Sequence, residues 1–194
     1  MIRLALLRHG HTDWNRAGRI QGRSDIPLDA QAEAHLAALA LPAPWDDATL
    51  WSSPLRRARR TAELVAGRIP GTDPALIEMD WGRWEGRHGR DLRADPASGY
   101  RDIEHWGWEF RPPGGESLAD LRDRVLAWAA RLEETALAVC HIGVMRVLIA
   151  HALDWNFRGE PPFRIKRDRL FVLEKGAGRW TFDPRQVPLV ARDR

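Results

Sequence analysis

The stretch Ile2-Arg3-Leu4-Ala5-Leu6-Leu7-Arg8-His9-Gly10 decides the fold, because a mainly apolar run ends at two basic side chains and a glycine. A short apolar run of this kind is typical of a strand buried on both faces of a parallel sheet. Open sheets of this type bind ligands beyond the carboxyl ends of their strands. Arg8 and His9 are therefore the first candidates for a functional site.

Strand and helix patterns alternate along the rest of the chain. Strands are predicted at 49–51 and 135–140, and the tail predicts a hairpin; the predicted helices cover 30–41, 53–69, 118–132 and 144–153. Serine marks two helix starts, Ser53 before Pro54 and Ser117 three residues before Asp120. This order predicts an α/β fold, a three-layer sandwich whose mainly parallel sheet is flanked by helices.

One segment lacks a clean period. Residues 79–115 are rich in Trp, Gly, Arg and Asp, and we expect them to form a small cap or insert within a single domain over 1–194. The tryptophans of this segment are expected to pack it onto the core. The alternative is that some of them, such as Trp106 and Trp108, line a substrate cap.

Composition excludes several classes of protein. Cys140 is the only cysteine, so neither an intramolecular disulfide nor a cysteine zinc cluster can form. The net charge is only +3 and the arginines are interleaved with acids, which disfavours nucleic-acid binding. No apolar run approaches the roughly 20 residues of a membrane span. We expect a cytoplasmic protein without nucleic-acid or membrane partners.

The predicted strand ends bring together groups that suit phosphate chemistry. His9 and His141 each follow a predicted strand. Arg8 lies at the end of the first predicted strand, and Arg57 follows the second. Helix N-termini and arginines both favour a bound phosphoryl group. A neutral histidine can attack phosphorus, and a carboxylic acid must then protonate the leaving oxygen. Glu78 follows the apolar residues 75–77, so we expect it at a further strand end.

Six motifs in the same order resemble those of the histidine phosphatase superfamily, which has the phosphoglycerate-mutase-like fold. They are Leu6-Leu7-Arg8-His9-Gly10-His11-Thr12 with Trp14-Asn15, Ile20-Gln21-Gly22-Arg23 with Pro27-Leu28, Ser52-Ser53-Pro54-Leu55-Arg56-Arg57-Ala58 with Thr61-Ala62, Glu78-Met79-Asp80-Trp81-Gly82-Arg83-Trp84-Glu85-Gly86, Gly114-Gly115-Glu116-Ser117 and Cys140-His141-Ile142-Gly143-Val144. The resemblance covers residues 2–150. Residues 78–92 are similar to the α-ribazole phosphatase branch.

The resemblance implies a role for each matching residue. His9 is the implied phosphate acceptor and Glu78 the proton donor. The rest of the implied phosphate site is Arg8, Arg57, His141, Asn15, Gln21 and Ile142. Arg57 is preferred to Arg56 because it directly precedes Ala58.

Two positions depart from the family pattern. His11 stands where glutamate is more common, which changes the polarity at the mouth of the site. Ile142 stands where glycine is common, which tightens the pocket. Neither departure removes a catalytic group.

The leading hypothesis is a phosphatase that hydrolyses a small-molecule phosphate monoester, releases inorganic phosphate and needs no metal or cofactor. The alternatives are a phosphoglycerate mutase, disfavoured by the short chain, a non-catalytic phosphate-binding module, and a metal hydrolase using His9 and His11. Cys140 is expected to be a buried strand residue rather than a nucleophile. A homodimer is compatible with the sequence, which does not define the oligomeric state.

Overall fold

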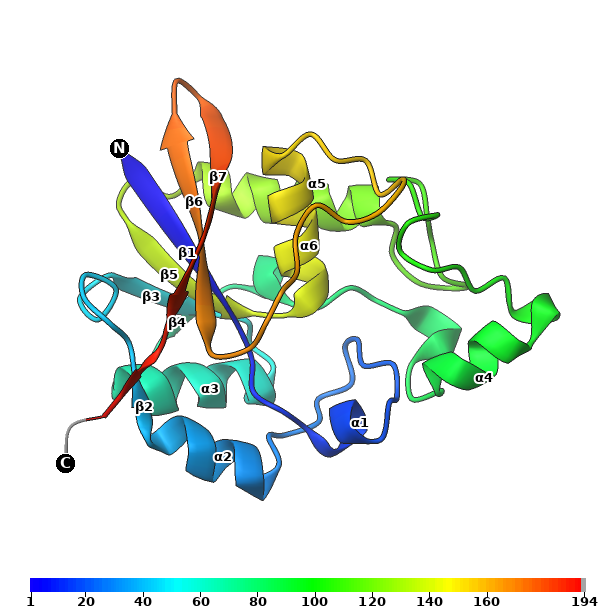
Figure 1. The fold of residues 1–194 in the computed structure, drawn as a ribbon, viewed down its shortest axis with the longest axis horizontal. Helices are drawn as coiled ribbons and strands as arrows, with labels where there is room; N and C mark the ends of the chain where they lie inside the picture. The colour runs from blue at the N-terminus through cyan, green and yellow to red at the C-terminus, as the bar shows by residue number, and fades with distance from the viewer. Residues whose placement is uncertain (193–194) are drawn as a thin grey trace.

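The computed structural model describes residues 1–192 and contains a six-stranded sheet between two layers of helices (Figure 1). The strand order is β4-β3-β5-β1-β6-β7, with β1, β3, β4 and β5 parallel and the β6–β7 hairpin antiparallel to β1. The strands are β1 (Ile2–Arg8), β3 (Thr49–Ser52), β4 (Gly71–Thr72), β5 (Ala136–Cys140), β6 (Arg169–Gly176) and β7 (Arg179–Pro188). The predicted α/β fold with a mainly parallel sheet is confirmed.

The helices cover both faces of this sheet, and Figure 1 shows α2 and α3 on one side and α5 and α6 on the other. The α-helices are α1 (Asp13–Arg16), α2 (Ala30–Ala37), α3 (Arg56–Ala66), α4 (Gly89–Ala94), α5 (Leu118–Ala130) and α6 (Ile142–Ala152). Three 3₁₀ turns are η1 (Pro74–Leu76), η2 (Gly82–Trp84) and η3 (Pro96–Ser98).

The alternation of side chains along β1 divides the core into two halves. Leu4 and Leu6 are fully buried in the cluster that contains the apolar faces of α5 and α6. Ala5 and Leu7 point the other way, into the cluster that contains the apolar faces of α2 and α3. Successive strand side chains face opposite sides of a sheet, so one apolar strand serves both layers. This arrangement is the predicted three-layer sandwich.

Two helix boundaries differ from the prediction. Helix α2 ends at Ala37 rather than at residue 41, because Leu39–Ala40 (β2) pairs with Val190–Ala191 (β8) in a separate two-stranded sheet. Helix α3 begins at Arg56 rather than at Ser53. The Ser53 hydroxyl accepts a hydrogen bond from the N–H of Leu55 and also contacts a histidine ring, so it does not cap the helix.

The expected strand before Glu78 is absent, and this prediction is wrong. Residues Pro74–Leu76 form the 3₁₀ turn η1, which begins where the Asp73 carboxylate accepts the N–H of Ala75. Proline at the first position favours such a turn over a strand. By contrast, the capping box between Ser117 and Asp120 at the start of α5 is confirmed.

Residues 79–115 extend beyond the carboxyl end of the sheet and carry α4 (Figure 1). Trp81, Trp84 and Trp106 are buried in the same cluster as α5 and α6, which confirms the expected packing for these three. Trp108 is half-buried beneath the guanidinium of Arg122. The extent of the single domain stays a prediction, and residues 193–194 lie outside the described range.

None of the helices within residues 1–192 combines the length and the apolar character needed to cross a bilayer.

Trp128 of α5 provides a test of this packing. Its side chain is 2% exposed and meets Trp51 edge-on at 6.3 Å between ring centroids. Trp128→Ala should lower the free energy of unfolding by about 3–5 kcal/mol, because it removes a large buried side chain and leaves a cavity. Urea denaturation measures the change. Ile69→Ala, at a side chain that is 85% exposed, is the control and should change stability by less than about 0.5 kcal/mol.

Candidate active site

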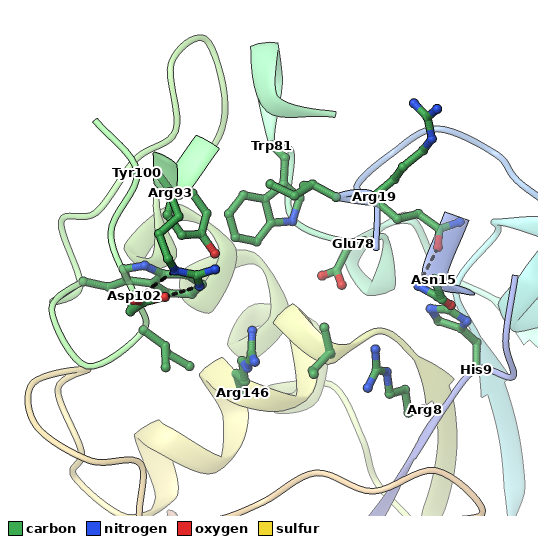
Figure 2. Close-up of a pocket in the computed structure, with 15 residues that line it drawn as sticks. Arg8, His9, Asn15, Arg19, Glu78, Trp81, Arg93, Tyr100, Asp102 and Arg146 are labelled. Atoms are coloured by element: carbon green, nitrogen blue, oxygen red, sulfur yellow. Dashed lines mark hydrogen bonds and ion pairs between the residues drawn. The ribbon is translucent and has the colours of Figure 1, made fainter. Parts of the chain in front are cut away.

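A cavity of about 390 Å³ opens where β1 ends and α6 begins, beneath the 79–115 segment (Figure 2). Its lining is Arg8, His9, Asn15, Arg19, Ile20, Gln21, Glu78, Trp81, Arg93, Tyr100, Asp102, Ile103, Trp106, Ile142 and Arg146. Six of the eight residues proposed from the sequence therefore line one cavity. The other two, Arg57 and His141, are fully buried and do not line it.

The protonation of His9 is defined by its surroundings. Its Nδ1 lies 2.7 Å from the carbonyl oxygen of Gly10, which can only accept, so Nδ1 carries the proton and Nε2 keeps its lone pair. Burial, followed by the charges of Arg57 and Arg8, lowers the pKa of His9 well below its ordinary value. The imidazole is therefore neutral, with a nucleophilic nitrogen available.

His141 lies beside His9, with 5.1 Å between the ring centroids. It directly precedes α6, and its Nε2 lies 2.8 Å from the hydroxyl of Ser53. Burial and the charge of Arg57 lower the pKa of His141 as well. A bound phosphoryl dianion has the opposite effect, because it stabilises the protonated ring.

Neither of the two proposed phosphate-binding arginines, Arg8 and Arg57, has a carboxylate partner within residues 1–192. Arg57 donates to the carbonyl oxygens of Gly22 at 2.6 Å and Ser24 at 2.8 Å, while its Nε has no partner within residues 1–192. Burial lowers the pKa of Arg8 to about 9 and that of Arg57 to about 10, so both remain cationic at neutral pH. Arg56, the rival candidate, is exposed.

Two backbone N–H groups orient Glu78, which does not lie at the end of a strand as expected. One carboxyl oxygen accepts the N–H of Met79 at 2.8 Å, and the other accepts the N–H of Gly143 in the first turn of α6 at 3.1 Å. Burial is the largest influence and raises the pKa of Glu78, which favours the protonated acid. A Cβ at Gly143 would lie 2.3 Å from a carboxyl oxygen, so only glycine leaves this position open.

Asn15 and Gln21 form one hydrogen-bonded unit at the edge of the cavity. The Gln21 side-chain oxygen accepts from the Thr12 hydroxyl at 2.9 Å and the Asn15 amide at 3.1 Å. Its amide nitrogen is buried and has no partner within the described residues. A buried amide donor normally has a hydrogen-bond partner, so this nitrogen is left with unused bonding capacity.

The model of the histidine phosphatase superfamily (branch 1) matches residues 4–186. The chain belongs to the histidine phosphatase superfamily.

Individual members of the superfamily support the same assignment. The chain is 36% identical over 189 residues to the protein named Probable phosphoglycerate mutase GpmB of Salmonella paratyphi C, covering 93% of this chain and 88% of that protein. It is 36% identical over 183 residues to the adenosylcobalamin/alpha-ribazole phosphatase of Salmonella typhimurium, covering 82% and 86%. The crystal structure of phosphoglycerate mutase from Thermus thermophilus is 33% identical, with a TM-score of 0.73 over 99% of this chain and 100% of that one.

Two arginines of this superfamily member were missed by the sequence analysis. Arg167 donates to the carbonyl oxygen of His9 at 3.2 Å and to the Asn15 side chain at 3.0 Å. Arg146 lines the cavity from α6. Arg146 lies five residues after His141 on a predicted helix, and this spacing could have placed it near the site. Arg167 lies in an irregular segment before β6, where no sequence periodicity predicts its position.

His11 and Cys140 lie outside the cavity lining. His11 lines a separate pocket with Arg16, His35 and Asp168, and residues 1–192 contain no group of three or more His, Cys, Asp or Glu side chains that could hold a metal ion. Cys140 is fully buried, and burial raises the pKa of its thiol, which disfavours a thiolate.

The state of His9 can be observed directly. In protein labelled with ¹⁵N in its histidines, the ring nitrogens of His9 should show the Nδ1–H tautomer. Because burial and neighbouring arginines oppose protonation, the ring should stay neutral on acidification through the ordinary histidine range. NMR chemical shifts measure both properties, and His9→Ala assigns the signals. An Nε2–H tautomer, or titration near the ordinary value, would contradict this description.

Proposed function

We propose that this protein hydrolyses small-molecule phosphate monoesters through a phosphohistidine intermediate at His9. The observation that carries the proposal is a neutral, Nδ1-protonated His9 beside buried arginines, with the carboxyl group of Glu78 lining the same cavity. Membership of the superfamily supports it independently. The chemistry requires a nucleophile, fixed positive charge and an acid, and the cavity provides all three.

The first step transfers the phosphoryl group to the protein. His9 Nε2 attacks phosphorus while the bond from phosphorus to the ester oxygen breaks. Protonated Glu78 gives its proton to the departing oxygen, and an alcohol leaves. Arg8, Arg57 and protonated His141 stabilise the charge on the transferring oxygens, because fixed charges in a water-poor site need little reorganisation.

The second step returns the protein to its starting state. Glu78, now a carboxylate, accepts a proton from a water molecule that attacks the phosphohistidine. The phosphorus–nitrogen bond breaks, and inorganic phosphate leaves. One carboxyl group therefore serves as acid and then as base, which its backbone hydrogen bonds to Met79 and Gly143 allow because they hold it in place in both forms.

Phosphoryl transfer between positions of a bound sugar acid is the second candidate, favoured by relatives named as phosphoglycerate mutases. The same groups serve both reactions, which differ in the acceptor that enters after the first step. Incubation with 3-phosphoglycerate, followed by measurement of 2-phosphoglycerate and inorganic phosphate, distinguishes the two. Hydrolysis predicts phosphate as the main product.

His9→Ala should reduce turnover of phosphate esters to background and abolish the covalent phosphoenzyme, because the variant lacks the nitrogen that attacks phosphorus. Rapid acid quenching after mixing with a ³²P-labelled ester measures the phosphoenzyme in the wild type and the variant. His105→Ala, at an exposed histidine, is the matched control and should retain both signals. Persistent phosphoenzyme in His9→Ala would disprove the assignment.

The pH dependence of kcat/KM should be bell-shaped. Activity falls on the acid side when His9 becomes protonated, at a pH below the ordinary histidine range, and on the alkaline side when Glu78 loses its proton. Glu78→Gln should remove the alkaline limb and lower kcat/KM for alkyl phosphates by about 10²–10⁴-fold. The loss should be much smaller for p-nitrophenyl phosphate, whose leaving group needs no proton.

Exposed Glu109 offers a matched control for the Glu78 variant, because Glu109→Gln makes the same chemical change away from the cavity. The ionisation of the substrate is common to all the enzymes compared, so differences between profiles report the protein. Equal losses for alkyl and p-nitrophenyl esters in Glu78→Gln would argue against a proton-donating role.

A further inference from the structure

Arg146 is a cation of the cavity that the proposed reaction does not use. It lies on α6, one turn beyond Gly143, and its half-buried side chain lines the cavity. Figure 2 shows its guanidinium directed into the cavity, with Arg8 between it and His9 in this view. The ring of Trp106 lies 5.8 Å from the guanidinium carbon and provides a flat wall on one side.

No carboxylate within residues 1–192 forms an ion pair with Arg146. Asp102, an acid of the same cavity, is paired with Arg93. Glu78 is nearby, but burial favours its neutral form and its oxygens accept backbone N–H groups. Partial burial is the largest influence on the pKa of Arg146 and lowers it, because the cation loses part of its hydration. Such a charge is stabilised when an anion binds.

The direction of the reaction places Arg146 on the leaving-group side. In-line attack by His9 puts the ester oxygen on the far side of phosphorus. Glu78 must reach that oxygen to protonate it, so the alcohol extends beyond Glu78 and away from His9. Arg146 lies on that side of the cavity in Figure 2, and the ring of Trp106, which also lines the cavity, packs beside its guanidinium.

We propose that Arg146 binds a second anionic group, a carboxylate or a further phosphate, on the alcohol portion of the substrate. The inference rests on the proposed function and narrows the substrate class to phosphate monoesters that carry a second acid. A planar guanidinium can hold either group through two parallel hydrogen bonds.

A second cavity next to the main one supports the proposal that the substrate carries an acidic group near Arg146. It has a volume of about 250 Å³ and shares Ile103, Ile142 and Arg146 with the main cavity. Its other walls include the apolar Phe163 and the cationic Arg164. Positive charge therefore continues from Arg146 into a cavity that His9 does not line, which suits an alcohol that carries an acidic group.

The decisive measurement is equilibrium binding of two non-hydrolysable phosphonates. Methylphosphonate presents the phosphoryl group alone, and phosphonoacetate adds one carboxylate. Isothermal titration should show that the wild type prefers phosphonoacetate. In Arg146→Gln this preference should fall about tenfold or more, while the Kd for methylphosphonate changes less than about threefold. Methylenediphosphonate extends the comparison to a second phosphate-like group.

Two further variants separate a specific contact from general effects. Arg90→Gln removes one positive charge from an exposed arginine that does not line the cavity, and it should keep the preference. Arg146→Lys keeps the charge but cannot form two parallel hydrogen bonds, so it should retain part of the preference for phosphonoacetate. This variant tests the role of Arg146 even if Arg146→Gln folds poorly. Equal weakening of both phosphonates in Arg146→Gln would assign Arg146 to the phosphoryl group and overturn the proposal.

Turnover distinguishes failure of this inference from failure of the proposed function. Wild-type kcat/KM for 3-phosphoglycerate should exceed that for glycerol 3-phosphate, in which a hydroxymethyl group replaces the carboxylate, and Arg146→Gln should remove the difference. Hydrolysis of both esters without a preference contradicts only the role of Arg146. Absence of hydrolysis and of phosphoenzyme with every ester contradicts the proposed function, while the phosphonate titrations still test the anion site.

Discussion

Positive charge buried beside a neutral histidine is the constraint on which the rest of the site depends. Arg57 is fully buried, and carbonyl oxygens rather than carboxylates hold its guanidinium. Carbonyls accept from its guanidinium without neutralising its charge, so the cation opposes protonation of His9. The same two carbonyls belong to the 22–24 loop, whose N–H groups are held from the other side by Glu85. Arg57 thus positions a loop and polarises the site at once.

Backbone N–H groups position the carboxyl group of Glu78. Glu78 follows a 3₁₀ turn, and its carboxyl group is held by the N–H of Met79 and by the first turn of α6 through Gly143. Its own carbonyl, and that of Ile77, accept from Arg124, which is paired with Glu116. Helix α6 follows His141 directly, so one helix start orders the second histidine and the acid together. A short irregular segment is thereby fixed by hydrogen bonds from α5 and α6.

Prediction from the sequence was accurate where local periodicity carried the information. The strand that ends at Arg8, the strand before His141 and the capping box at Ser117 all have a pattern that neighbouring residues determine. It failed where a distant partner intervened. Residues 39–40 leave the expected helix to pair with β8, and Ser53 faces His141 instead of capping α3. Neither partner lies near in sequence, so no local pattern could reveal the competition.

The sequence alone determined the α/β fold and named His9, Arg8, Arg57, Glu78 and His141, because strand ends and ordered motifs are local features. The tertiary structure decided how these groups act. The Nδ1–H tautomer of His9, the raised pKa of Glu78 and the carbonyl anchoring of Arg57 follow from burial and from contacts across the fold. Arg167 reaches His9 across 158 positions of sequence, and Arg146 gains its place from the packing of α6 beneath the 79–115 segment. Burial and distant contacts set charge states, and they exist only once the chain has folded.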